Sequence, residues 1–144
     1  MQTASLSIGA QINASCTLDV VTQVSFGTVD LTAPAPTDAI GTFTLDCSSG
    51  APVYITLGQG TNPAAGSSDA APMRQMSAGA TDRLAYQLYR NAAYTQLWGN
   101  TQPTAAVLLG SGAAQSVAIY GRVAPGQAVV SGAYQDTVLA TVTY

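Results

Sequence analysis

Side chains able to carry out chemistry are few in this chain of 144 residues. Its ionisable groups are seven Asp, four Arg, two Cys and the tyrosines, and it contains no His, Lys or Glu. General acid–base catalysis relies mostly on His, Glu, Asp and Lys. Asp19, Asp30, Asp46 and Asp136 stand apart from one another, and no G-x-S-x-G sequence is present. We therefore expect no enzyme and no catalytic residue.

The two cysteines, Cys16 and Cys47, form the remaining reactive pair. No CxxC sequence, histidine or cluster of carboxylates accompanies them, which argues against a zinc site or a redox motif. Two interpretations stay open, a pair of buried free thiols or one disulfide between neighbouring strands. We favour the disulfide, which requires an oxidising compartment and would stabilise the fold by roughly 3–4 kcal/mol. We expect neither a metal nor a cofactor.

Aromatic and basic side chains give two candidate binding features. Trp98, with Tyr89 and Tyr94 nearby, has the composition of a sugar-stacking platform, but an aromatic partly buried in a sandwich is the favoured interpretation. Arg74 and Arg83 flank a loop of small residues and are suited to an acidic partner. Solvated arginines are the favoured interpretation there.

Composition limits the partners further. Charged residues make up 8% of the chain, the net charge is −3 and the isoelectric point is near 4.2, which argues against a nucleic-acid partner. A surface so poor in charge suits a protein covered by its neighbours. No run approaches the roughly 20 apolar residues of a membrane span. No signal peptide is visible, and we interpret Met1 as an added start or a processing remnant on a mature exported chain.

The elements that position these residues are expected to be strands. Short alternating segments follow one another, joined by Gly- and Pro-rich turns, with no convincing helix. Residues 83–90 also fit helical spacing, but their tyrosines and flanking turn residues favour a strand. The pattern predicts one all-β sandwich domain. The predicted strands are 16–21, 24–31, 41–47, 53–58, 83–90, 96–99, 105–110, 115–123 and 136–144.

The two ends of the chain carry the clearest alternation. Between residues 3 and 12 every even position is apolar, namely Ala4, Leu6, Ile8, Ala10 and Ile12. The segment 136–144 runs as a strand to the last residue, and one of its faces holds Val138, Ala140, Val142 and Tyr144. If this strand lies in the body of the sandwich, the next strand is missing, and an apolar groove remains beside an unpaired edge. The spare strand at one end matches the vacancy at the other.

Five stretches together resemble the spore coat protein U domain, the subunit family of archaic chaperone–usher pili in bacteria. They are CTL (16–18), LAYQLYR (84–90), LWG (97–99), IYGRVAPGQ (119–127) and GAYQDTVLATVTY (132–144). The resemblance spans nearly the whole chain, and the C-terminal GxYxDTVxxTVxY stretch is its most specific part. It implies an immunoglobulin-like sandwich lacking its last strand over residues 15–144, preceded by a donor-strand extension over residues 1–14. The family's disulfide maps to Cys16 and Cys47.

The resemblance also implies how the protein assembles. A periplasmic chaperone lends a strand, and the outer-membrane usher swaps it for the N-terminal extension of the next subunit, which is donor-strand exchange. The predicted function is a structural pilin, exported through the periplasm, that polymerises head to tail with identical or related pilins. The product would be an extracellular surface fibre for adhesion and biofilm formation. The alternative is a minor or tip-proximal subunit of the same fold that binds a surface or glycan.

Side-chain size departs from this expectation at two donor positions. Ala4 and Ala10 are small for residues that fill a groove. Most of the burial would therefore come from Leu6, Ile8 and Ile12.

Overall fold

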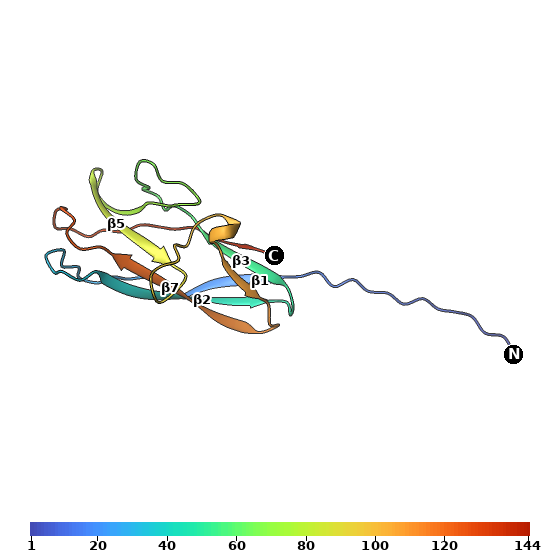
Figure 1. Cartoon of the computed structure of the whole chain (residues 1–144). Helices are drawn as coiled ribbons and strands as arrows, with labels where there is room; N and C mark the ends of the chain where they lie inside the picture. Colours follow the sequence, from blue (N-terminus) through green and yellow to red (C-terminus); the bar gives the residue numbers. More distant parts are fainter.

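The computed structural model describes residues 1–144 and consists almost entirely of strands and turns (Figure 1). The chain contains no helix with the length and apolar character needed to span a bilayer. In chain order the elements are β1 (Cys16–Thr22), β2 (Thr37–Cys47), β3 (Pro52–Leu57), β4 (Arg74–Ala78), β5 (Asp82–Tyr89), the 3₁₀ turn η1 (Gln102–Thr104), β6 (Ala106–Leu109), β7 (Ala114–Val123) and β8 (Ala140–Thr143).

The strands form two antiparallel sheets. The larger sheet has the order β1-β2-β7-β5-β4, and the smaller has the order β6-β3-β8. The longest pairing joins residues 37–46 of β2 to residues 114–123 of β7. Core side chains come from both sheets, so the two pack face to face as a sandwich. This confirms the predicted all-β, immunoglobulin-like class.

The core follows the predicted alternation. Because successive strand residues point to opposite faces, apolar residues at every second position lie together on one side of a sheet. Each large side chain buried in this way contributes roughly 1.5–3 kcal/mol. The larger buried aliphatic side chains and the buried phenylalanine are Phe43, Leu45, Val53, Ile55, Leu57, Leu84, Leu88, Val117, Ile119 and Val123.

Trp98 is part of this core. Its side chain is 0% exposed, its Nε1 donates a hydrogen bond to the Ile55 carbonyl at 2.8 Å, and its ring meets that of Phe43 edge-on with 6.2 Å between centroids. Trp98 is therefore more deeply buried than expected, since the favoured interpretation was an aromatic side chain only partly buried in the sandwich. A sugar-stacking role for Trp98 is wrong, because no face of its ring reaches the surface.

Arg74 corrects the prediction of a solvated arginine. Its side chain is buried, and Nη2 donates hydrogen bonds to the carbonyls of Leu57 at 3.1 Å and Trp98 at 2.6 Å. Nε donates to the carbonyl of Gly58 at 2.9 Å. Burial lowers the pKa of Arg74 to about 10, so it stays protonated at neutral pH. Arg83 lies nearer the surface and donates only to carbonyls of its own turn.

The predicted strand over residues 24–31 is wrong, although its apolar side chains do face the core. After β1 the chain leaves the sheet, and Val24 and Phe26 pack against Gly41 of β2 and Gly121 of β7. A Cβ atom added at Gly41 or Gly121 would lie 2.8 or 2.7 Å from a Val24 methyl group. The two glycines therefore let this segment cross the sheet without pairing to it.

Two further predicted strands are shorter in the structure. Residues 96–99 form only an isolated bridge between Leu97 and Tyr89. Residues 136–139 lie outside β8, and the pairing with β3 begins at Ala140. Residues 96–99 are held by a few separate backbone hydrogen bonds and residues 136–139 by one, from Gly58 to Leu139, together with side-chain packing instead of a continuous ladder.

Candidate strand-binding groove and N-terminal extension

The N-terminal extension has no partner within its own chain. Residues 1–15 are all exposed, and no backbone hydrogen bond joins residues 1–14 to the body. Figure 1 shows the extension leading straight away from the two sheets. The largest of the predicted donor side chains are 84% (Leu6), 89% (Ile8) and 93% (Ile12) exposed. The apolar face of this segment is therefore free to be covered by something else.

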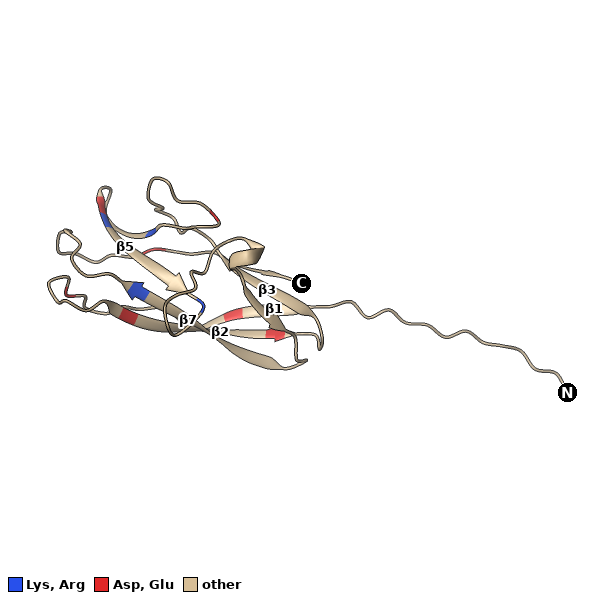
Figure 2. Cartoon of the chain, in the orientation of Figure 1, with Lys and Arg blue, Asp and Glu red and all other residues tan.

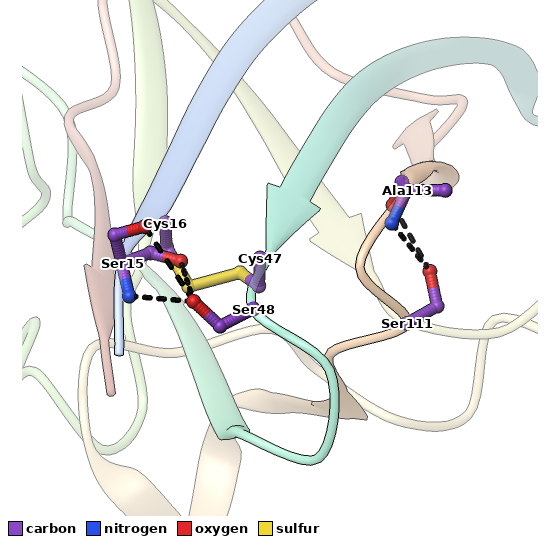
Figure 3. Close-up of a disulfide and its surroundings, with 6 residues drawn as sticks. All are labelled: Ser15, Cys16, Cys47, Ser48, Ser111 and Ala113. Carbon is purple, nitrogen blue, oxygen red and sulfur yellow. Dashed lines mark hydrogen bonds between the residues drawn. A yellow bond between two sulfur atoms is a disulfide. The ribbon is translucent and has the colours of Figure 1, made fainter. Parts of the chain in front are cut away.

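The root of the extension is fixed to the body. Cys16, the first residue of β1, forms a disulfide with Cys47, the last residue of β2, as predicted. Ser15 donates from its backbone N–H to Ser48 Oγ at 2.9 Å (Figure 3). The Ser48 N–H donates to the Ser15 carbonyl at 2.9 Å. The extension therefore starts from a rigid point, not from a frayed strand end.

A groove of about 530 Å³ opens on the body between residues 20–29 and residues 134–138. Its lining is mostly apolar and includes side chains from both sheets. The floor is formed by Phe43, Leu57, Met76, Leu84, Tyr86, Leu88 and Ile119. Most of these side chains also belong to the core. The groove is therefore a place where the core of the sandwich reaches the surface.

Each sheet has a free edge next to this groove. β1 is one of the two outer strands of the larger sheet and lines the groove with Val20 and Thr22. β8 is one of the two outer strands of the smaller sheet and begins two residues after Val138 of the groove wall. Pairs of Cα atoms from these two strands come within 8 Å of each other. A free strand edge presents unpaired N–H and C=O groups. The free edges offer backbone hydrogen bonds to an added strand, and the apolar floor offers a surface that can bury its alternate side chains.

The predicted groove-edge residues divide into two groups. Val138 lines the groove, and Ala140 and Val142 pack against the core from β8. Tyr144 lies beyond the end of β8, is 56% exposed and does not contact the core. The structure thus brings three of the four predicted residues together and leaves the last one apart.

A model of the Spore Coat Protein U domain matches residues 2–141. The chain belongs to this family. It is 40% identical to Protein U of Myxococcus xanthus over an alignment that covers 99% of this chain and 84% of that protein. The resemblance inferred from the five sequence stretches is therefore confirmed.

The fold also matches a solved structure, that of the CsuC–CsuE chaperone–tip adhesion subunit pre-assembly complex from archaic chaperone-usher Csu pili of Acinetobacter baumannii. The TM-score is 0.60 at 21% identity, over 92% of this chain and 40% of the matched chain. The present chain thus spans less than half the length of its structural neighbour. At this identity the likeness concerns the fold.

Sequence reasoning missed most of the groove of this Spore Coat Protein U domain. One wall is formed by Val24, Phe26 and Val29, which were placed only in a predicted strand over residues 24–31. The ring of Phe26 lies edge-on to Tyr86 on the floor, with 6.3 Å between centroids. The signal available in the sequence was an apolar alternation that continues past the end of β1.

The other wall of the Spore Coat Protein U domain contains a polar cluster that sequence reasoning also missed. Asp136, which looked isolated in the sequence, accepts hydrogen bonds from the Tyr86 hydroxyl at 2.5 Å, the Thr61 N–H at 2.9 Å and Thr61 Oγ1 at 2.7 Å. Burial, and then the bond to Asp136, raises the pKa of Tyr86 well above its usual range, so the hydroxyl stays a donor. The available signal was the DTV triplet of the C-terminal motif.

Charge is nearly absent around the groove and the smaller sheet. Asp136 is the one charged side chain that lines the groove, and β3, β6 and β8 carry none. The charges lie on β1, β2, β4, β5 and β7 and on the loops (Figure 2). No group of three or more His, Cys, Asp or Glu side chains is placed to hold a metal ion. The chemistry of the groove suits an extended, uncharged and largely apolar segment.

Proposed function

We propose that this chain is a structural pilin subunit that polymerises by donor-strand exchange into a surface fibre of the archaic chaperone–usher type. The observation that carries the proposal is that one chain holds both an uncovered apolar segment and an open apolar groove. Residues 1–14 form an uncovered segment whose sequence alternates like a strand with one apolar face, and residues 15–144 form a sandwich with an open apolar groove. Each part supplies what the other lacks.

The extension of one copy would enter the groove of the next. Main-chain hydrogen bonds to the free edges would set its register, and alternate side chains would fill the groove. Burying Leu6, Ile8 and Ile12 would contribute roughly 1.5–3 kcal/mol each. A head-to-tail contact that does not close on itself generates an open filament. The product of this joint is therefore a fibre.

The root of the extension favours a second copy over the chain's own groove. The extension leads directly into β1, which itself borders the groove. To fill its own groove, the chain would have to reverse direction at Ser15, where the disulfide and the bonds to Ser48 fix its exit. An intermolecular joint needs no such reversal.

Partners and location follow from the same proposal. An empty groove needs cover before assembly, which a periplasmic chaperone would give until an outer-membrane usher brings in the next subunit. The structural neighbour was solved as a chaperone–subunit complex, which supports this route. The Cys16–Cys47 disulfide fits export into an oxidising compartment. Adhesion and biofilm formation would be functions of the finished fibre at the cell surface.

A peptide-binding experiment tests the proposal. The acceptor is the full chain carrying Ile8→Asp, which cannot donate its own extension because the carboxylate would be buried without a partner. We expect a synthetic peptide of residues 2–14 to bind this acceptor and to raise its melting temperature. The same peptide carrying Ile8→Asp should bind at least about a hundredfold more weakly.

The matched control is a peptide carrying Ser7→Asp, which adds the same charge to the outward face of the same strand. It should bind within about threefold of the unmodified peptide, because outward side chains of an added strand stay in water. Equal losses for Ser7→Asp and Ile8→Asp, or no binding of the unmodified peptide, would overturn the proposal.

A further inference from the structure

A carboxyl side chain, that of Asp136, faces inward on one wall of the groove. Along residues 134–138 the partly buried side chains are Tyr134, Asp136 and Val138, and the residues between them are exposed. The position of Asp136 is one that the alternation would otherwise give to an apolar residue. A carboxylate in such a place is costly unless it is fully hydrogen-bonded.

Asp136 connects the wall to both sheets. Tyr86 donates to it from β5 in the larger sheet, and Thr61 donates twice from the loop that follows β3 in the smaller sheet. The Tyr86 side chain is 7% exposed, so its hydroxyl has little access to water as an alternative partner. One carboxylate thus gathers donors from two elements on opposite sides of the core.

The loop is shaped to fit this carboxylate. Gly60 has φ +84°, in the left-handed region that favours glycine, and a Cβ atom added there would overlap the Asp136 carboxylate. The Thr61 N–H can reach Asp136 only because the preceding residue has no side chain. The close approach of the Gly60–Thr61 backbone to the Asp136 carboxylate therefore depends on the glycine as well as on the Thr61 and Asp136 side chains.

Few other hydrogen bonds hold this wall in place, although Tyr134 and Val138 also pack against the core. Residues 134–138 belong to no strand, and backbone bonds fix the wall only at Gln135, paired with Ser77, and beyond it at Leu139, bonded to Gly58. An empty apolar groove would bury more surface if its walls moved together over the floor. The Asp136 bonds are placed to oppose that closure.

We propose that Tyr86, Asp136 and Thr61 form a polar latch that holds the groove open for an incoming strand. The inference rests on the proposed function and adds to it three positioning residues that act on the empty subunit. Once a strand is seated, its own side chains keep the walls apart, and the latch has no further effect. The latch therefore controls how fast a strand enters, not how long it stays.

Binding kinetics separate these two effects. The acceptor is again the full chain with Ile8→Asp, now combined with Tyr86→Phe or Asp136→Asn, and the probe is the fluorescent peptide of residues 2–14. If latch loss reduces the open population to a tenth, the association rate falls about tenfold. The dissociation rate of the seated peptide should stay within about twofold.

Matched controls carry the same chemical change elsewhere. Tyr120→Phe removes a tyrosine hydroxyl on β7, and Asp38→Asn changes a carboxylate on β2 that is bonded to Arg122; none of these residues lines the groove. Both should leave the two rates unchanged. Thr61→Val keeps the backbone bond to Asp136 and removes only the hydroxyl bond, so it should slow association by an intermediate factor of about three. Because Thr61→Val is a small change, it can still test the latch if Tyr86→Phe or Asp136→Asn prevents folding.

Each outcome decides the inference. Unchanged association rates in the latch variants would overturn it, and so would faster dissociation with unchanged association, which would indicate contacts to the bound strand instead. If the peptide fails to bind even the acceptor with an intact latch, the proposed function fails, and the latch with it. If the peptide binds, but with the same association and dissociation rates in the latch variants and in the acceptor with an intact latch, the latch is overturned and the proposed function is not.

Discussion

Residues 41–47 of β2 and residues 4–12 of the extension carry the same alternation of apolar and polar side chains in opposite surroundings. Leu45 of β2 is 0% exposed, whereas Ile8 of the extension is 89% exposed. β2 pairs with β1 on one side and β7 on the other, but the extension pairs with nothing. The pattern fixes which face of a strand is to be buried. It does not fix whether the cover comes from the same chain.

The two regions meet at Cys16, and this junction separates their stabilities. The body has a disulfide, a core shared by two sheets and a buried arginine bonded to three carbonyls. The extension has one hydrogen bond, between the side chains of Gln11 and Asn13. The body can therefore stay folded with an empty groove while the extension remains unpaired and exposed.

The largest expected effect comes from giving the body its missing strand in cis. Moving residues 3–12 to follow Tyr144 through a short flexible linker supplies the strand at high effective concentration. Burial of three large side chains at roughly 1.5–3 kcal/mol each predicts a rise in melting temperature of about 10–25 °C and a monodisperse monomer. Calorimetry and light scattering measure both.

The control for this graft carries Ile8→Asp within the moved segment and should show no such rise. The interpretation fails if the unmodified chain is a stable monomer whose melting temperature survives deletion of residues 1–12. In that case the body would be complete, and the contrast between the two regions would have no functional meaning.

Removing the disulfide tests the stability of the body at the junction. The double change Cys16→Ser and Cys47→Ser should lower the free energy of unfolding by roughly 2–5 kcal/mol. The unfolded chain then regains the conformational entropy that is lost when the disulfide closes a loop across a sequence separation of 31. Denaturant titration measures this loss, and thiol counting on the unmodified denatured protein should find no free thiol. Fibre yield should fall while fibre shape stays the same. A pair of titratable thiols would contradict the assignment.

The smallest effect is expected on the outer face of the larger sheet. Arg122 donates to Asp38 at 2.7 and 2.9 Å, with about a third of each side chain exposed. Hydrogen bonding by Arg122 lowers the pKa of Asp38. The contribution of this ion pair to the stability of the fold is therefore fully present above the ordinary pKa near 3.8 and is lost as the pH falls through the lowered pKa. Arg122→Gln should cost at most about 0.5 kcal/mol and remove that acid dependence. A loss above about 2 kcal/mol in urea unfolding would show that the surface is coupled to the core.

Sequence reasoning predicted the parts of the fold that depend on local pattern. The alternation in β2, β3, β5 and β7 indicated which side chains face inward, and the two cysteines had only each other as partners. It did not predict the crossing of Val24 and Phe26 over two glycines, because that path depends on residues far along the chain.

Polar groups were harder to place than apolar ones. Arg74 looked solvated because charged residues are mostly exposed, and its carbonyl partners cannot be identified from local sequence. The bond between Tyr86 and Asp136 spans 50 positions of the sequence. Within the candidate site, the apolar face of residues 4–12 and the place of Val138 beside a groove could be predicted from alternation. The wall of residues 24–29 and the bonds of Asp136 could not, because they depend on the arrangement of both sheets.

Hydrogen exchange in the extension tests the central claim most directly. The unmodified full chain is separated into monomers and assemblies, and the exchange of backbone amides 3–12 is measured in each fraction. If the extension of one copy fills the groove of another, these amides exchange at least about a hundredfold more slowly in assemblies than in monomers. The chain with Ile8→Asp should show no protected fraction. Assemblies whose amides 3–12 exchange at the rate of an unfolded peptide would contradict the account.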